Sequence, residues 1–202
     1  MTNALNRLSR CRNWIFDMDG TLTLAAHDFD DIRQALQIND GTPILEAIAA
    51  MPPSRADATR RHLHAIEMEI AHQSKPQPDA ATTLASLQQR GFKLGILTRN
   101  AEDIAEATLS AAGLSQFFSK EEIIGRDSCA PKPDPEGIFQ LLRHWQADAT
   151  QSAMVGDYLF DLDAGRNANV TTVHFSPEGD FLWPEKTDVT IRSLSELTDH
   201  LG

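Results

Sequence analysis

The alternation of strand and helix patterns from residue 79 onward most constrains how this chain can fold. Apolar runs of strand length occupy 92–97, 152–156 and 170–175, and a further short run lies at 189–191. Strands that alternate with helices form a parallel sheet covered by helices on both faces. The sequence therefore predicts an α/β fold with a three-layer core.

Helical patterns separate these strands, and most of them carry recognisable end signals. The predicted helices are 79–90, 101–112, 135–145, 161–168 and a last one from Ser193. Asp79 is placed to cap the first of them, and glycines at 91 and 113 end the first two. Glu196 stands three residues after Ser193, which is the spacing of a capping box.

A helical block interrupts this alternation directly after the first strand. The first predicted strand is 14–17, and no strand pattern follows between residues 24 and 78. Three helices are expected there: one around Ile32, one around 44–49, and a longer one capped by Ser54. We therefore expect a catalytic core formed by 1–23 and 79–202, with 24–78 as a small inserted helical cap.

Charged, hydroxyl and amide side chains gather just past the predicted strand ends. They are Asp17, Asp19, Thr98, Arg99, Asn100, Asp157 and Asp161, together with Lys132 in a proline-rich loop. In a parallel sheet the carboxyl ends of the strands open on one edge, and ligands bind at that edge. The sequence thus predicts that these side chains form one site.

Asp17 and Asp19 stand two positions apart where the first strand ends, and a divalent cation is the usual partner for such a pair. A carboxylate can attack phosphorus, so Asp17 is the candidate nucleophile. Asp19 is the candidate general acid and base. Mg²⁺ prefers oxygen ligands, for which Asp17, Asp157 and the backbone carbonyl of Asp19 are the candidates.

The remaining polar residues fit a phosphate group. Thr98 and the helix start that follows it form a candidate anion site. Lys132 is expected to neutralise phosphoryl oxygens and to hold Asp17 in place.

Three of the candidates keep alternative interpretations. Arg99 is either a phosphate contact or an exposed loop residue, and Asn100 either contacts phosphate or caps the following helix. Asp161 binds the metal directly, binds it through water, or orients Lys132.

Four short motifs in order resemble those of the haloacid dehalogenase-like (HAD) hydrolase superfamily. Residues 17–21, Asp-Met-Asp-Gly-Thr, are similar to its motif I, Thr98 stands at the motif II position, and Lys132 fits motif III. Residues 156–161 match the GDxxxD pattern of motif IV. A helical insert between motifs I and II resembles the C1-capped subfamily I, which includes phosphoglycolate phosphatase and β-phosphoglucomutase.

The resemblance implies a Rossmannoid core, Mg²⁺ and an aspartyl-phosphate intermediate. Haloacid dehalogenases lack the second motif I aspartate, whereas Asp19 is present here, so a phosphatase acting on a small phosphorylated metabolite is expected. A β-phosphoglucomutase-like phosphosugar mutase uses the same residues and stays open as an alternative. A non-catalytic phospholigand-binding module is the third hypothesis.

Composition limits the kinds of binding partner and the cellular compartment that we expect for this chain. The 202-residue chain has a net charge of −11 and shows no basic cluster, which argues against nucleic-acid or anionic-membrane binding. With two cysteines and no apolar run of signal-peptide or membrane-spanning length, a cytoplasmic protein is expected. A monomer and a homodimer are equally compatible with the sequence.

Overall fold

The computed structural model describes residues 7–25, 28–39 and 41–199, and its centre is a single six-stranded sheet. The strands are β1 Asn13–Phe16, β2 Lys93–Leu97, β3 Ile123–Ile124, β4 Ser152–Gly156, β5 Thr171–Phe175 and β6 Val189–Ile191. Their order is β3-β2-β1-β4-β5-β6, and every neighbouring pair is parallel. The predicted parallel α/β fold is confirmed.

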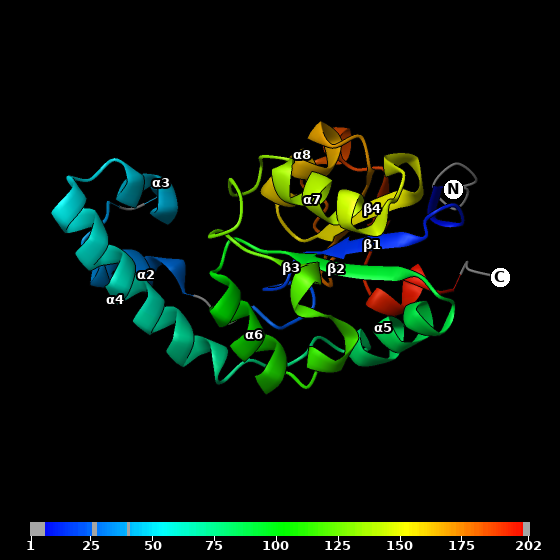
Figure 1. The fold of residues 1–202 in the computed structure, drawn as a ribbon, viewed down its shortest axis with the longest axis horizontal. Helices are drawn as coiled ribbons and strands as arrows, with labels where there is room; N and C mark the ends of the chain where they lie inside the picture. The colour runs from blue at the N-terminus through cyan, green and yellow to red at the C-terminus, as the bar shows by residue number, and fades with distance from the viewer. Residues whose placement is uncertain (1–6, 26–27, 40, 200–202) are drawn as a thin grey trace.

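Two pairs of helices cover the two faces of this sheet (Figure 1). Helices α5 Ala80–Gln89 and α6 Glu102–Ala111 lie on one face, and α7 Glu136–Trp145 and α8 Leu159–Asn167 lie on the other. Strand β1 is buried throughout, and its side chains alternate between two apolar clusters. Trp14 and Phe16 pack toward α5 and α6, whereas Ile15 packs toward α7 and α8. This is the predicted three-layer core.

Short 3₁₀ turns connect several of these elements. They are η1 Ser115–Phe117, η2 Lys120–Glu122, η3 Ala149–Gln151, η4 Pro184–Lys186 and η5 Leu194–Leu197. The last predicted helix is thus a 3₁₀ turn, although its capping box forms as expected, with the Ser193 N–H donating to Glu196 at 2.9 Å.

Three helix starts differ from those predicted. The long helix α4, Pro53–Ala71, begins one residue before Ser54, because the fixed φ and missing N–H of Pro53 suit a first turn. Asp79 precedes α5 with a φ of 63°, and its carboxylate accepts a bond from Ser193 instead of capping the helix. Helix α8 begins at Leu159, so Asp161 lies within its first turn.

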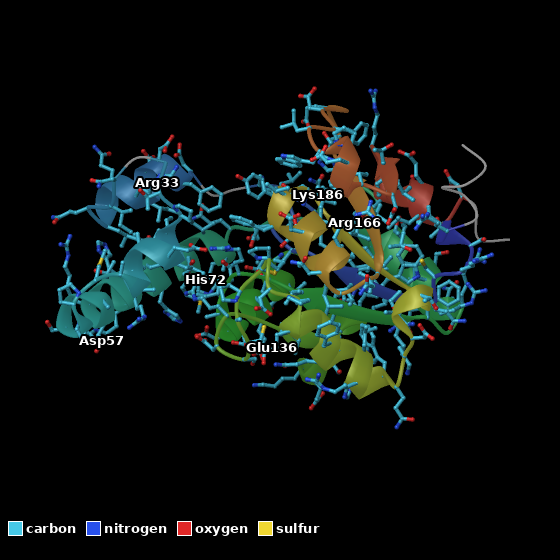
Figure 2. All side chains as sticks on the ribbon, turned by 90° about the horizontal axis from the view of Figure 1, so that it is seen from above. Arg33, Asp57, His72, Glu136, Arg166 and Lys186 are labelled. Atoms are coloured by element: carbon cyan, nitrogen blue, oxygen red, sulfur yellow. The ribbon has the colours of Figure 1, made fainter. Side chains whose placement is uncertain are left out.

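The segment 24–78, which we call the insert, lies beyond the carboxyl ends of the strands (Figure 1). It contains α2 Phe29–Ala35, α3 Ile44–Ala49 and α4. These helices share an apolar cluster of their own, made of Ile32, Leu36, Ile38, Ile48, Ala56 and Leu63. Figure 2 shows Arg33 and Asp57 toward the far end of the insert and His72 where α4 meets the core.

The C-terminal half of α4 packs directly against the core. Ala71 joins Ala101 and Ile104 in a small buried cluster at the start of α6. Glu67 forms a bidentate ion pair with Arg126, at 2.8 and 2.6 Å, and both side chains are largely buried. The insert is therefore attached to the core along half of a helix as well as through its two chain connections.

No helix within the described part of the chain is both long and apolar enough to cross a membrane.

Candidate active site

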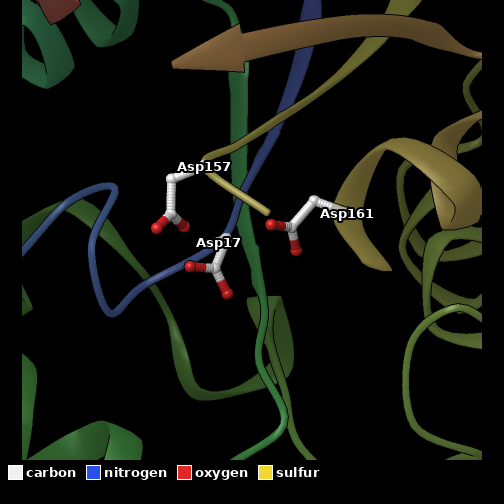
Figure 3. A group of neighbouring side chains, drawn as sticks. All are labelled: Asp17, Asp157 and Asp161. Atoms are coloured by element: carbon white, nitrogen blue, oxygen red, sulfur yellow. The ribbon is translucent and has the colours of Figure 1, made fainter. Parts of the chain in front are cut away.

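Three carboxylates converge where β1 and β4 end (Figure 3). Asp17 directly follows β1, and its N–H still donates to Val155 of β4 at 2.8 Å. Asp157 follows β4, and Asp161 comes from the first turn of α8. One oxygen from each of the three carboxylates lies within 4.8 Å of the other two. The structure thus brings together three side chains that the sequence predicted to meet.

The Lys132 ammonium lies between two of these carboxylates. Its Nζ is 2.5 Å from Asp17 Oδ1 and 2.6 Å from Asp161 Oδ1, and its side chain is 2% exposed. A buried ammonium is tolerated only where carboxylates pair with it, so the position of Lys132 depends on both partners. Lys132 therefore lies beside Asp17, as the sequence predicted.

Burial and mutual repulsion shift the pKa values of this group. Burial raises the pKa of Asp17 well above its ordinary range, and the nearby Lys132 ammonium opposes this shift. Burial and the Asp161 carboxylate raise the pKa of Asp157 to about 6. Although burial alone lowers it, the carboxylates of Asp161 and Asp17 raise the pKa of Lys132. Three carboxylates thus face one ammonium, which leaves negative charge uncompensated.

This donor set fits a hard cation such as Mg²⁺. Carboxylate oxygens are its preferred protein ligands, and the excess negative charge favours it electrostatically. Both Asp161 oxygens already accept hydrogen bonds, Oδ1 from Lys132 and Oδ2 from the Tyr158 N–H at 3.0 Å. Asp17 and Asp157 are therefore better placed than Asp161 to provide ligand oxygens.

A second group surrounds Asp19, at the turn that follows β1. The Asn100 amide donates to Asp19 Oδ2 at 2.7 Å, and the Asn100 N–H donates to Thr98 Oγ1 at 3.1 Å. Thr98 is buried where β2 ends. The residue that caps α6 is Ala101, so the alternative in which Asn100 caps that helix is wrong. Asn100 instead holds the carboxylate of Asp19.

The turn between Asp19 and Thr21 has little room for a side chain. Gly20 has a φ of 90°, and a Cβ added to it would lie 2.4 Å from Asp157 Oδ2. Thr21 donates to Asp157 Oδ1 at 3.2 Å, and Gln77 donates to the Gly20 carbonyl at 3.2 Å. Motif I therefore touches motif IV through its glycine and threonine as well as through its aspartates.

The side chain of Arg99 is held in place by contacts on the core and on the insert. Its Nη1 donates to the Lys132 carbonyl at 2.6 Å, and its Nη2 donates to Glu46 of α3 at 2.7 Å. The guanidinium carbon also lies 4.5 Å from the centre of the Phe160 ring. The alternative in which Arg99 is a free, exposed loop residue is therefore wrong.

Several contacts around the site were not predicted. Glu46, Phe160, Thr21 and Gln77 each contact a predicted site residue or the motif I turn. For Thr21 and Phe160 a signal was available, because both lie inside motifs already singled out. Glu46 and Gln77 lie in or beside predicted helices of the insert and carry no comparable signal.

Comparisons with known proteins agree with this arrangement. A sequence model described as haloacid dehalogenase-like hydrolase matches residues 14–175. Pyrophosphatase PpaX of Halalkalibacterium halodurans is 28% identical over 93% of this chain and 95% of its own length. Phosphoglycolate phosphatase of Caulobacter vibrioides is 30% identical over 78% of this chain and 76% of its own length.

Solved structures share the fold. A hydrolase from Pseudomonas syringae superposes with a TM-score of 0.78 at 23% identity, covering 94% of this chain and 97% of its own. The HAD-hydrolase YfnB of Bacillus subtilis, solved with bound magnesium, gives a TM-score of 0.68 at 22% identity, with 96% and 99% covered. These likenesses support the layered α/β architecture described above.

Proposed function

Because the chain belongs to the haloacid dehalogenase-like hydrolase family, we propose that it is a Mg²⁺-dependent phosphatase of small phosphorylated metabolites. The observation that carries the proposal is the position of Lys132, which lies within 2.6 Å of both Asp17 and Asp161 while Asp157 faces them. A buried carboxylate beside an ammonium and a candidate cation site is a suitable nucleophile for phosphoryl transfer.

In the proposed reaction Asp17 and Asp19 have different tasks. A carboxylate oxygen of Asp17 forms a bond to phosphorus while the bond from phosphorus to the ester oxygen breaks. Asp19 gives a proton to the departing alcohol oxygen. It then takes a proton from the water that attacks the phosphorylated Asp17, which releases phosphate and restores the carboxylate. The Asn100 bond would keep the Asp19 carboxylate aimed at the reacting oxygens.

The other residues would bind the phosphate and the metal ion and orient the reacting groups. Lys132 would neutralise phosphoryl oxygens and hold the attacking oxygen of Asp17, while Asp161 orients Lys132. Thr98 and the start of α6 would supply hydroxyl and N–H donors to the phosphate. Asp17, Asp157 and the Asp19 carbonyl would hold Mg²⁺, which when bound shields negative charge between nucleophile and phosphate.

The insert is assigned the role of a cap in this proposal, with 1–23 and 79–202 as the catalytic core. Its helices lie beyond the strand ends that carry the site. From α3, Glu46 accepts a hydrogen bond from Arg99 of the core. A cap at this position would exclude water during phosphoryl transfer and would contact the leaving group. Relatives named for pyrophosphate and for phosphoglycolate support a small phosphorylated substrate as the class.

The test is phosphate release from p-nitrophenyl phosphate with and without Mg²⁺. We expect turnover that EDTA abolishes and added Mg²⁺ restores, and a loss of about 10³-fold or more in Asp17→Asn. Asp163 lies on α8 and forms an ion pair with Lys186 of η4. Asp163→Asn is therefore the matched control and should keep its activity. Full activity in Asp17→Asn would refute the nucleophile assignment. With a sugar phosphate as substrate in place of p-nitrophenyl phosphate, an isomeric sugar phosphate without free phosphate would indicate the mutase instead.

A further inference from the structure

We propose that Arg99 is a positioning residue that couples the insert to the loop carrying Lys132, and that it is not a ligand of the substrate phosphate. The kinetic part of this inference rests on the proposed phosphatase function. Arg99 would then not be the phosphate contact that the sequence suggested, and Glu46 and Phe160 would hold its guanidinium in place.

The guanidinium of Arg99 makes three contacts within the protein. One terminal nitrogen donates to the Lys132 carbonyl at 2.6 Å, and the other donates to the Glu46 carboxylate at 2.7 and 2.9 Å. Its flat face rests on the Phe160 ring at 4.5 Å. Because the planar guanidinium is held at two of its nitrogens and on one face, its orientation is fixed. A lysine at this position could not make the same set of contacts.

Few hydrogen bonds besides that of Arg99 hold the main chain of the Lys132 loop. The Asp134 N–H donates to the Pro131 carbonyl at 3.1 Å, and Asn167 donates to the Pro133 carbonyl at 3.1 Å. Prolines at 131, 133 and 135 remove three N–H groups from a short stretch, so this loop has few donors with which to hold itself. Arg99 fixes the main chain of Lys132 through its carbonyl, while Asp17 and Asp161 fix the ammonium at the other end. Lys132 is thereby held from both ends.

Glu46 connects this arrangement to the insert. It lies on α3, 53 positions away in sequence, and its side chain is 48% exposed. An ion pair this exposed contributes little to the free energy of unfolding. The ion pair instead affects geometry. The position of α3 sets the orientation of Arg99, and Arg99 sets the position of Lys132 through its hydrogen bond to the Lys132 carbonyl.

The experiment combines kinetics with a readout that needs no turnover. With p-nitrophenyl phosphate and Mg²⁺, we expect Arg99→Ala and Arg99→Lys to lower kcat about tenfold while KM stays within about twofold, as for loss of an interaction felt in the transition state. Glu46→Gln should lower kcat by a smaller factor. His64→Gln removes another insert-to-core contact of similar exposure, to Asp103, and should leave both constants unchanged.

The second readout is acetylation of Lys132 by acetic anhydride, followed by mass spectrometry of the substrate-free protein. Lys132 is buried, whereas Lys93 is exposed and serves as the internal reference. We expect Lys132 to be labelled several-fold faster in Arg99→Ala and in Glu46→Gln, with no large change in Tm. A residue that only bound substrate phosphate would not alter this labelling.

A charge-swapped double variant, Glu46→Arg with Arg99→Glu, separates coupling from simple closure of the insert. The swap restores an ion pair between α3 and the core, but a glutamate cannot donate to the Lys132 carbonyl. We expect kcat to stay low and labelling to stay fast. Recovery of wild-type kcat in the swap, unchanged Lys132 labelling in Arg99→Ala, or a rise in KM alone would each overturn the inference. Inactive wild-type protein would refute the proposed function, and the labelling would still decide the role of Arg99.

Discussion

Asp157 shows how the charge of the site depends on what occupies it. Burial and the Asp161 carboxylate raise its pKa to about 6, because two carboxylates at this distance are both partly deprived of water. In the proposed metal site a cation would need Asp157 ionised, so protons and Mg²⁺ would compete for it. Bound Mg²⁺ should therefore lower this pKa, and the resting protonation of the site should change between its metal-free and metal-bound forms.

We predict that the affinity for Mg²⁺ falls about tenfold between pH 7 and pH 5, because Asp157 gains a proton through its pKa of about 6. Titration calorimetry with MgCl₂ measures this directly.

The same pKa has an opposite effect on the metal-free protein, since the folded state keeps a proton that the unfolded chain releases from about pH 4 upward. Stability in EDTA should thus decline as pH rises from 4 to above 6.

The Asp157→Asn variant is the control for both measurements. It should bind Mg²⁺ weakly at either pH, and its unfolding free energy in EDTA should fall less than that of the wild type between pH 5 and pH 7.5. An affinity for Mg²⁺ that stays constant from pH 7 to pH 5 in the wild type would show that Asp157 titrates elsewhere or is not a ligand.

At the scale of the helices and strands, the sequence predicted what depends on local pattern. The strands β4 and β6 have the predicted bounds, because a short buried apolar run between turn signals is enough to define each. Helix starts were less predictable, since the carboxylate of Asp79 accepts a hydrogen bond from Ser193, 114 positions away, instead of capping its own helix. Most polar residues of the site could be predicted because they follow strand ends of a parallel sheet. Asp161 lies in the helix after β4, and Lys132 lies in a loop before α7.

Contacts between the insert and the core could not be predicted from local pattern. Glu46–Arg99 and Glu67–Arg126 join residues 53 and 59 positions apart, and a glutamate on a predicted helix face is ordinarily exposed to solvent. Which face of α4 meets α6 depends on tertiary packing, which helical periodicity alone leaves open. The C-terminal half of α4 packs with the core through Ala71 and through the Glu67–Arg126 ion pair.

The Glu67–Arg126 pair should therefore matter more for stability than the other ion pairs of α4. Glu67→Gln leaves the largely buried Arg126 guanidinium without its charge partner, so we predict a loss of about 2–4 kcal/mol in unfolding free energy. Urea denaturation followed by circular dichroism measures it. Asp57→Asn breaks the exposed pair with Arg60 on the same helix and should change stability by less than about 0.5 kcal/mol. Equal losses would contradict the distinction.

At the scale of the whole molecule, the boundary between apolar clusters does not coincide with the ends of the insert in the sequence. The insert cluster takes residues from α2, α3 and α4 and shares no member with the two clusters that line the sheet, among the residues described. Ile66 and Ile70, in the C-terminal half of α4, also pack against the insert cluster. The C-terminal half of α4 packs with α6. Local opening should therefore release α2 and α3 while the end of α4 stays on the core.

This division predicts how hydrogen exchange should respond to a cavity in the insert. Leu63 is buried within the insert cluster, and Leu63→Ala should weaken that cluster by about 2–4 kcal/mol. Amides of α2 and α3 should then exchange on the order of 100-fold faster, while those of β1 and β4 keep their wild-type rates. Leu141→Ala, a cavity of equal chemistry against the sheet, should accelerate exchange in the strands. If Leu63→Ala accelerates β1 and β4 as much as α2, the insert and the core open as one unit and the division is wrong.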